Sequence, residues 1–207
     1  MTVPARQASS GVRRGGPARS DLILRQAAAL FQEKGYLGTT TRELGDAVGI
    51  RGASVYYHFK TKEDILYGIC LESLRYLGER VTAAAEGIAD PILRLRALIE
   101  AHVINILVDR QMHATMLTEV RYLSPERRQE VTTRRDAYER ILEDAVAAGQ
   151  ADGGVRTDIT SRRLTLSLLS LLNWTIFWYS PDGVLSVDAV ASMLATVFLE
   201  GALNRPN

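Results

Sequence analysis

The sequence predicts an all-α fold, and two patterns support this prediction. Apolar residues recur at intervals of three and four along most of the 207 residues, as they do on one face of a helix, and no alternating run indicates a strand. Ser, Thr, Asp, Pro and Gly separate these stretches at the positions where helices begin and end. We therefore expect about nine helices, divided into an N-terminal three-helix domain and a larger helical C-terminal domain.

Charge is distributed unevenly along the chain, whose net charge is +1. Residues 1–67 hold ten Lys and Arg against six Asp and Glu, whereas the remainder holds fifteen against eighteen. A basic N-terminal third on an acidic body is typical of a nucleic-acid reader with a separate regulatory domain. Residues 1–19 are rich in Gly, Ser, Pro and Arg, so we expect a disordered basic arm that is either a DNA contact or a solvated tail.

Composition argues against several functional classes. The single Cys70 excludes an intramolecular disulfide framework and fits a reducing cytoplasm. No secretory signal is visible, and the longest apolar stretch, 164–179, is shorter than the roughly 20 residues of a bilayer helix, so we expect a cytoplasmic protein without membrane contact. Because the chain has no nucleophile elbow, no phosphate-binding glycine loop and no metal-ligand cluster, we expect no catalytic residues, no metal and no cofactor.

The first helices predict a compact N-terminal unit. A helix over Asp21–Lys34 carries a regular apolar face and should end at Gly35. Thr40 and Glu43 then have the spacing of a capping box at the start of a second, short helix, for which Gly49 is a natural stop. Another short helix is expected after the Gly49 turn. Two short helices joined by a glycine turn form the helix-turn-helix pattern, in which the later helix enters the major groove of DNA.

The residue types around this turn suit DNA recognition. Ser54 can reach base edges, Arg51 can contact a guanine, and the tyrosines and His58 can donate to phosphates. A plain three-helix core with exposed tyrosines is the alternative. The candidate DNA-binding residues are Thr40, Thr41, Arg42, Arg51, Gly52, Ser54, Tyr56, Tyr57, His58 and Lys62.

Six further helices are expected in the C-terminal body. Thr61 should cap a long helix that reaches about Glu86, and Asp90-Pro91 should start the next. A short helix around His113 follows. Ser124-Pro125 should begin a helix that reaches about Ala148, before a break over Gly149–Gly154. The last two helices are expected over about Ile159–Tyr179 and from Ser186 onward.

The last two helices are more apolar than one small body can bury. A partner surface resolves this excess, and a two-fold dimer is the commonest closed oligomer. We therefore expect a homodimer through these helices. The candidate interface residues are Leu168, Val190, Leu194, Val197 and Phe198.

Polar residues on apolar helical faces give the body a second candidate site. His102 and His113 each lie on such a face, where hydrogen-bonded core histidines are the commonest arrangement and a ligand pocket is the alternative. Apolar walls with a few polar groups are the usual composition of a small-molecule site. The candidate effector-binding residues are His102, Asn105, Met116, Tyr138, Asn173 and Trp174.

The N-terminal residues resemble the tetracycline-repressor (TetR) family of bacterial transcriptional regulators. The resemblance covers roughly Asp21 to Leu66 and implies a helix-turn-helix DNA-binding domain over 20–66, followed by an effector-binding and dimerisation domain over 67–207. In the family, the last two helices form a four-helix bundle with the same pair from a second subunit. The residues that carry the resemblance are Ala28, Phe31, Gly35, Tyr36, Thr39, Thr40, Leu44, Ala47, Gly49, Ile50, Lys60, Lys62, Glu63, Leu66 and the run 55–59.

The C-terminal half resembles a narrower TetR subgroup. The spacing from Asn173-Trp174 through Trp178-Tyr179 to Pro181, Gly183 and Leu185 is similar to regulators of fatty-acid and sterol-fragment breakdown, whose effectors are acyl-CoA thioesters. Phe177 stands where many of these relatives carry a basic residue. The resemblance therefore implies an acyl-CoA effector, but it does not imply that residue 177 contacts the CoA phosphates.

These observations favour a dimeric, ligand-responsive repressor. It would bind a palindromic operator and be released by a small-molecule effector, with an acyl-CoA thioester as the first choice. A drug-responsive repressor of an efflux gene is the alternative within this class. An effector-independent architectural DNA-binding protein is the alternative outside it, and an enzyme is disfavoured because no catalytic motif is present.

Overall fold

The computed structural model describes residues 17–47 and 58–203, and within them it confirms the all-α prediction. These residues form no strand, and their one β-bridge joins Val155 to Leu203. None of the helices in the described ranges is long and apolar enough to cross a membrane. The helices are α1 (Pro17–Gly38), α2 (Thr41–Ala47), α4 (Lys62–Ala84), α5 (Pro91–Val108), α6 (Arg110–Glu119), the 3-10 turn η2 (Val120–Tyr122), α7 (Pro125–Ala151), α8 (Ser161–Asn173), α9 (Thr175–Trp178) and α10 (Val187–Ala202).

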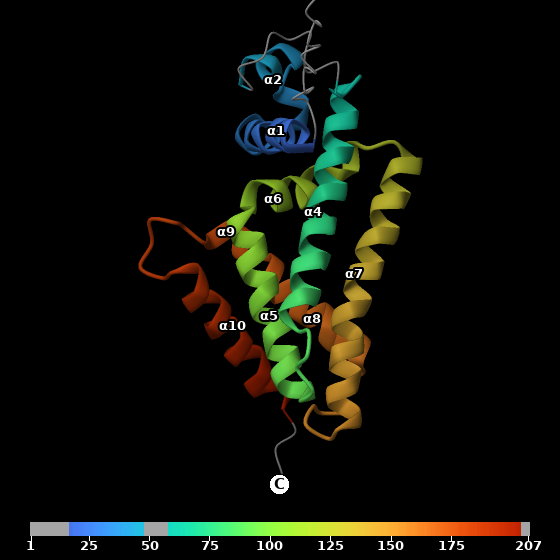
Figure 1. Cartoon of the computed structure of the whole chain (residues 1–207), viewed down its shortest axis with the longest axis vertical. Helices are drawn as coiled ribbons and strands as arrows, with labels where there is room; N and C mark the ends of the chain where they lie inside the picture. The colour runs from blue at the N-terminus through green and yellow to red at the C-terminus, as the bar shows by residue number, and fades with distance from the viewer. Residues whose placement is uncertain (1–16, 48–57, 204–207) are drawn as a thin grey trace, which may run out of the picture.

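The long helix α4 connects the two parts of the molecule. It starts beside α1 and α2 at one end and runs down into the body, where α5 and α7 flank it (Figure 1). In the body, α10 packs on α5 and α8 packs on α7, while the short α6 lies under α1. The α1–α2 unit, which we call the head, therefore rests on α4 and α6.

Side-chain caps set most of the helix starts at the residues that the sequence predicts. The Thr61 hydroxyl accepts from the Asp64 amide at 3.0 Å while the Asp64 carboxylate accepts from the Thr61 amide at 2.8 Å, a complete capping box. Asp90 caps α5 ahead of Pro91, and Ser186 caps α10. Ser124 is the exception, because its side chain makes no cap and its backbone N–H donates to Glu63 at 3.0 Å.

Three helix boundaries differ from the expected ones. The helix α1 begins at Pro17, so residues 17–19 are helical rather than part of the arm, and Gly35 interrupts it with φ 75°. The helix α7 continues through Gly149 to Ala151. The long helix expected over 159–179 is broken at Trp174, where the Thr175 hydroxyl donates to the Leu172 carbonyl oxygen at 2.7 Å. Apolar residues continue across this break, which is why periodicity alone does not reveal it.

The hydrophobic core does not divide at residue 66. One cluster of buried residues fills the lower body between α5, α7, α8 and α10. The other joins Ile23 and Phe31 of the head to Ile69 of α4 and to Met112 and Met116 of α6. The head therefore completes its core with side chains from the body, so a displacement of α4 or α6 is transmitted to it through close packing.

Candidate functional site

The described part of the head presents the start of α2 to solvent. Thr40 and Glu43 form the predicted capping box, with the Thr40 amide donating to the Glu43 carboxylate at 2.8 Å. The ammonium of Lys34 lies 2.7 Å from the same carboxylate, and these contacts lower the pKa of Glu43 to about 2. Thr40, Thr41 and Arg42 are all exposed at this helix start, where backbone N–H groups and the helix dipole favour a phosphate.

Lys62, another candidate DNA contact, bonds to the backbone of the head. Its ammonium donates to the backbone carbonyls of Tyr36 at 2.7 Å and Thr39 at 3.0 Å, and lies 4.3 Å from the centre of the Tyr36 ring. Partial burial lowers its pKa. Lys62 therefore stabilises the turn between α1 and α2 with two of its three N–H donors, and its expected contact with DNA stays a prediction.

The remaining candidate DNA contacts stay predictions. His58 is half-buried just before α4. The other positions lie outside the described residues, and they are Arg51, Gly52, Ser54, Tyr56 and Tyr57.

The helix α6 supports the head through side-chain hydrogen bonds. The Thr115 hydroxyl donates to the Ala28 carbonyl oxygen at 3.2 Å, and the Gln32 amide donates to Thr115 at 3.2 Å. One turn further along α6, the buried Glu119 carboxylate accepts from the Tyr36 amide at 3.2 Å. Because these bonds lie along one side of α6, they join α1 to that side of the helix.

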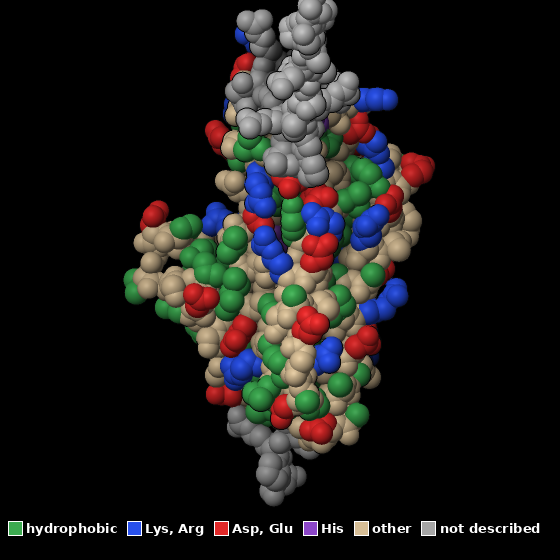
Figure 2. All heavy atoms as spheres, viewed as in Figure 1, with side chains coloured by type: hydrophobic (Ala, Val, Ile, Leu, Met, Phe, Trp, Pro, Cys, Tyr) green, Lys and Arg blue, Asp and Glu red, His purple; other side chains and the backbone are tan. Residues whose placement is uncertain are grey.

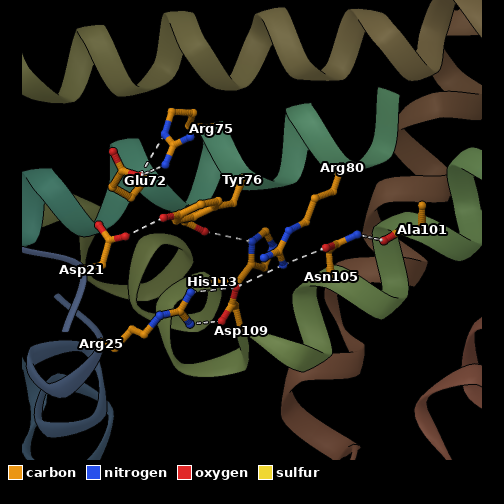
Figure 3. Close-up of polar contacts among 11 residues, drawn as sticks. Asp21, Arg25, Glu72, Arg75, Tyr76, Arg80, Ala101, Asn105, Asp109 and His113 are labelled. Carbon is orange, nitrogen blue, oxygen red and sulfur yellow. Dashed lines mark hydrogen bonds and ion pairs between the residues drawn. The ribbon is translucent and has the colours of Figure 1, made fainter. Parts of the chain in front are cut away.

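A second polar contact between head and body centres on Asp109, at the turn between α5 and α6 (Figure 3). Arg25 from α1 bonds to both oxygens of its carboxylate, and Arg80 from α4 approaches it at 3.5 Å. The bond to Asp109 raises the pKa of Arg25. Nearby, the Tyr76 hydroxyl donates to Asp21 at 2.8 Å, so α1 is bonded both to α4 and to the turn between α5 and α6 (Figure 3).

A chain of hydrogen bonds crosses the apolar interior below the head, and each of its five members comes from a different helix. Ser73 of α4 lies 3.4 Å from His113 Nδ1, and His113 Nε2 lies 3.2 Å from Asn173 Oδ1. The same Asn173 oxygen lies 3.2 Å from His102 Nε2, and His102 Nδ1 lies 2.5 Å from the Tyr138 hydroxyl. We call these five residues the polar chain.

The Tyr138 hydroxyl fixes the direction of every bond in the polar chain. Tyr138 is buried, and burial raises its pKa, so the hydroxyl keeps its proton. Among the described residues its one hydrogen-bond partner is His102 Nδ1, so the buried O–H is satisfied only by donating to that nitrogen. His102 Nδ1 is its partner and therefore accepts, which places the His102 proton on Nε2 and directs it at Asn173 Oδ1. His113 meets the same oxygen and must also donate from Nε2, so its Nδ1 accepts from Ser73.

Both histidines are neutral in this arrangement. Burial lowers the pKa of His102 to about 3, and the nearby His113 adds to this effect. Burial likewise lowers the pKa of His113 to about 4. Within the described residues, no group of His, Cys, Asp and Glu side chains has the arrangement of a metal site. The polar chain is therefore an uncharged network of donors and acceptors inside an apolar body.

A cavity of about 30 Å³ adjoins the polar chain. Four of the six predicted effector residues line it, namely His102, Met116, Tyr138 and Asn173. Asn105 does not, because its side chain bonds to Arg80 and to the Ala101 carbonyl oxygen (Figure 3). Trp174 does not either, because it follows the end of α8 and the residue is 63% exposed. The other lining residues are Leu74, Leu77, His113, Leu117, Arg135, Glu139 and Leu169.

The predicted dimer residues divide into a buried group and a solvent-accessible group. Leu168 and Val190 are fully buried within the protomer and Leu194 nearly so, which corrects the expectation that they meet a partner directly. They lie on the inner faces of α8 and α10. Val197 is 57% exposed and Phe198 is half-buried. Figure 2 shows hydrophobic side chains on the side that carries α9 and α10. The exposed apolar residues of α8 to α10 and the turn between α9 and α10 are Leu166, Trp174, Phe177, Trp178, Val184, Leu185, Met193 and Val197.

Comparison with known proteins identifies the family. Residues 23–68 match the family model described as bacterial regulatory proteins of the tetR family, and residues 89–202 match a tetracyclin repressor-like C-terminal domain. The chain belongs to the TetR family. The HTH-type transcriptional repressor KstR2 of Rhodococcus jostii is 31% identical to it over 210 residues, which cover 100% of both chains.

Two solved structures support the same assignment for this TetR-family chain. PfmR, a TetR family transcriptional regulator from Thermus thermophilus, has 37% identity and a TM-score of 0.80, covering 88% of this chain and 99% of its own. AibR, crystallised with isovaleryl coenzyme A and operator DNA, has 30% identity and a TM-score of 0.76, covering 86% and 97%. The chain is therefore a DNA-binding transcriptional regulator and not an enzyme.

Proposed function

We propose that this protein is a dimeric repressor that binds a palindromic operator and is released by a small-molecule effector, an acyl-CoA thioester. The observation that carries the proposal is the position of α6. This helix contributes His113 and Met116 to the cavity wall, and its Thr115 and Glu119 form hydrogen bonds to the head. A ligand in the cavity thus lies one helix away from the DNA-binding domain.

The size of the cavity supports a coupled movement. Pockets that enclose drug-sized ligands measure about 300–1,000 Å³, whereas this cavity measures about 30 Å³. An acyl chain fits only if the surrounding helices separate, and α4 and α6 are among them. Because both helices support the head, binding favours a shape in which the two heads of a dimer leave the operator register. An effector shifts this equilibrium only by its differential affinity for the two shapes.

Charge around the cavity favours an acyl-CoA over a lipophilic cation. A buried cation needs an available carboxylate. Glu139 lines the cavity but is ion-paired to Arg135 at 3.5 Å and to Arg162 at 3.2 Å. Glu119 is bonded to the Tyr36 amide, and Glu100 is paired with Arg96. Isovaleryl coenzyme A in the similar AibR structure and the resemblance of the C-terminal half both favour the thioester.

Operator binding tests the repressor proposal. A dimer should bind a pseudo-palindrome whose half-site centres lie about 34–36 Å apart. In gel-shift titrations at fixed salt, Tyr57→Ala and His58→Ala should each weaken binding, whereas Thr133→Val on the exposed surface of α7 should not. Unchanged affinity in both head variants would contradict the assigned recognition helix.

The effector-independent alternative is separated by the same assay. An architectural DNA-binding protein would keep its operator affinity at every concentration of acyl-CoA. The proposed repressor should lose affinity as butyryl-CoA or isovaleryl-CoA is added, and the free acids should have a weaker effect.

A further inference from the structure

Asn173 is the point where the two arms of the polar chain meet. Its Oδ1 accepts one hydrogen bond from His102 and one from His113, each at 3.2 Å. Because the Tyr138 hydroxyl fixes both donors, the carboxamide cannot turn over without placing its N–H groups against two N–H groups of the histidines. The orientation of Asn173 is therefore set by residues on four other helices.

This orientation leaves the amide nitrogen of Asn173 unused. Among the described residues, no acceptor bonds to its Nδ2, although the side chain is half-buried and lines the cavity. The ring nitrogens of both histidines and the hydroxyls of Ser73 and Tyr138 are all engaged within the chain. The polar chain therefore offers the cavity a hydrogen-bond donor.

We propose that the effector is recognised through a carbonyl oxygen that accepts a hydrogen bond from the Asn173 amide. This inference rests on the proposed function and names the chemistry that the cavity selects. The carbonyl belongs either to the thioester itself or to an oxo group further along the acyl chain. A carbonyl oxygen is a pure acceptor and matches a pure donor.

The same arrangement disfavours a free carboxylate. Both neighbouring histidines are neutral because burial lowers the pKa of each. Arg135 is a cation at the cavity wall, and it is paired with Glu139. A carboxylate would therefore be buried without a free counter-charge, which is costly. The neutral carbonyl of a thioester meets the same donor without this cost.

Three ligands of equal carbon number separate the possible sources of the carbonyl. S-butyl-CoA is a thioether without a carbonyl, butyryl-CoA has the thioester carbonyl, and acetoacetyl-CoA adds an oxo group. By calorimetry, the wild-type protein should bind S-butyl-CoA at least about tenfold more weakly than the better of the two carbonyl compounds, the loss expected for one buried hydrogen bond. Which carbonyl compound binds more tightly identifies the acceptor.

Substitution of Asn173 provides the matched test. In Asn173→Leu the preference for a carbonyl should fall below about threefold, whereas Thr133→Val should retain it. Because the leucine leaves two histidine N–H groups without an acceptor, its folding is checked by circular dichroism. A nuclear magnetic resonance measurement on the wild-type protein gives an independent test. The side-chain ¹⁵N–¹H₂ resonances of Asn173 are assigned by their loss in Asn173→Asp. They should shift with butyryl-CoA or acetoacetyl-CoA but not with S-butyl-CoA.

The outcomes distinguish this inference from the proposed function. Equal affinity for the three CoA compounds, or an unshifted Asn173 resonance with all of them, overturns the carbonyl contact while leaving the acyl-CoA effector in place. If none of them binds but ethyl acetoacetate shifts the Asn173 resonance, the effector class is wrong and the carbonyl contact stands. If none of the four compounds binds, both proposals fail.

Discussion

The buried histidine pair should make the protein lose stability in mild acid. Both histidines have folded-state pKa values far below the ordinary 6.5, at about 3 for His102 and about 4 for His113. As the pH falls below 6.5, both histidines become protonated in the unfolded chain but stay neutral in the folded protein. The stability present above pH 6.5 is therefore lost as the pH falls toward the folded-state pKa values.

The size of this loss follows from the same values. At pH 5.5, one unit below the unfolded pKa, each histidine costs about 1.4 kcal/mol, so the pair costs about 3 kcal/mol relative to pH 7.5. The result does not depend on the depth of the shift, because at pH 5.5 both folded-state groups remain unprotonated. Ordinary carboxylates titrate below this window, so they contribute little to it.

Denaturant unfolding at constant protein concentration measures the effect. The free energy of unfolding should fall by about 3 kcal/mol between pH 7.5 and 5.5 in the wild-type protein. The double variant His102→Gln/His113→Asn removes both titrating groups and should lose much less over the same range, whatever its stability at pH 7.5. A wild-type loss below about 1 kcal/mol, or an equal loss in the double variant, would refute the buried neutral pair.

Three substitutions test other parts of the structure. Thr40→Ala removes the cap of α2 and should cost about 1 kcal/mol in urea unfolding and weaken operator binding; an unchanged unfolding midpoint would contradict the capping box. Gly149→Ala places a methyl group 2.7 Å from Val155 Cγ2 and should cost about 1–3 kcal/mol, and a neutral result would mean that α7 adjusts freely. Val197→Glu adds a charge to the exposed apolar side of α10, so light scattering should detect a folded monomer. A folded dimer would place the interface elsewhere.

The helices and their starts could be predicted because local chemistry sets them. Thr61 and Asp90 bond to backbone amides within three residues, and such contacts depend on spacing in the sequence alone. Ser124 also precedes a helix as a typical capping residue, but its amide donates to Glu63 from a distant helix instead. The break at Trp174 escapes prediction for a related reason: apolar periodicity continues through it, and only packing determines where the helix ends.

The candidate cavity could be predicted in part. His102, Met116, Tyr138 and Asn173 lie on apolar faces, and the fold brings them together. Asn105 shares the helix of His102, but the position of Arg80 directs it elsewhere, and this depends on tertiary structure. Ser73 falls on an apolar stripe of the sequence, and its bond to His113 appears only when α4 and α6 are packed. Likewise, apolar periodicity does not separate an inner face from a partner face, so Leu168 and Val197 look equivalent in the sequence.

Calorimetry of butyryl-CoA binding, with and without a saturating operator duplex, tests the central proposal most directly. If α6 couples the cavity to the head, the ligand should bind the DNA-bound protein more weakly. The factor should equal the loss of operator affinity that saturating ligand causes in gel shifts, and a tenfold change corresponds to about 1.4 kcal/mol of coupling. Tight ligand binding with the same affinity in both states would contradict the proposed switch.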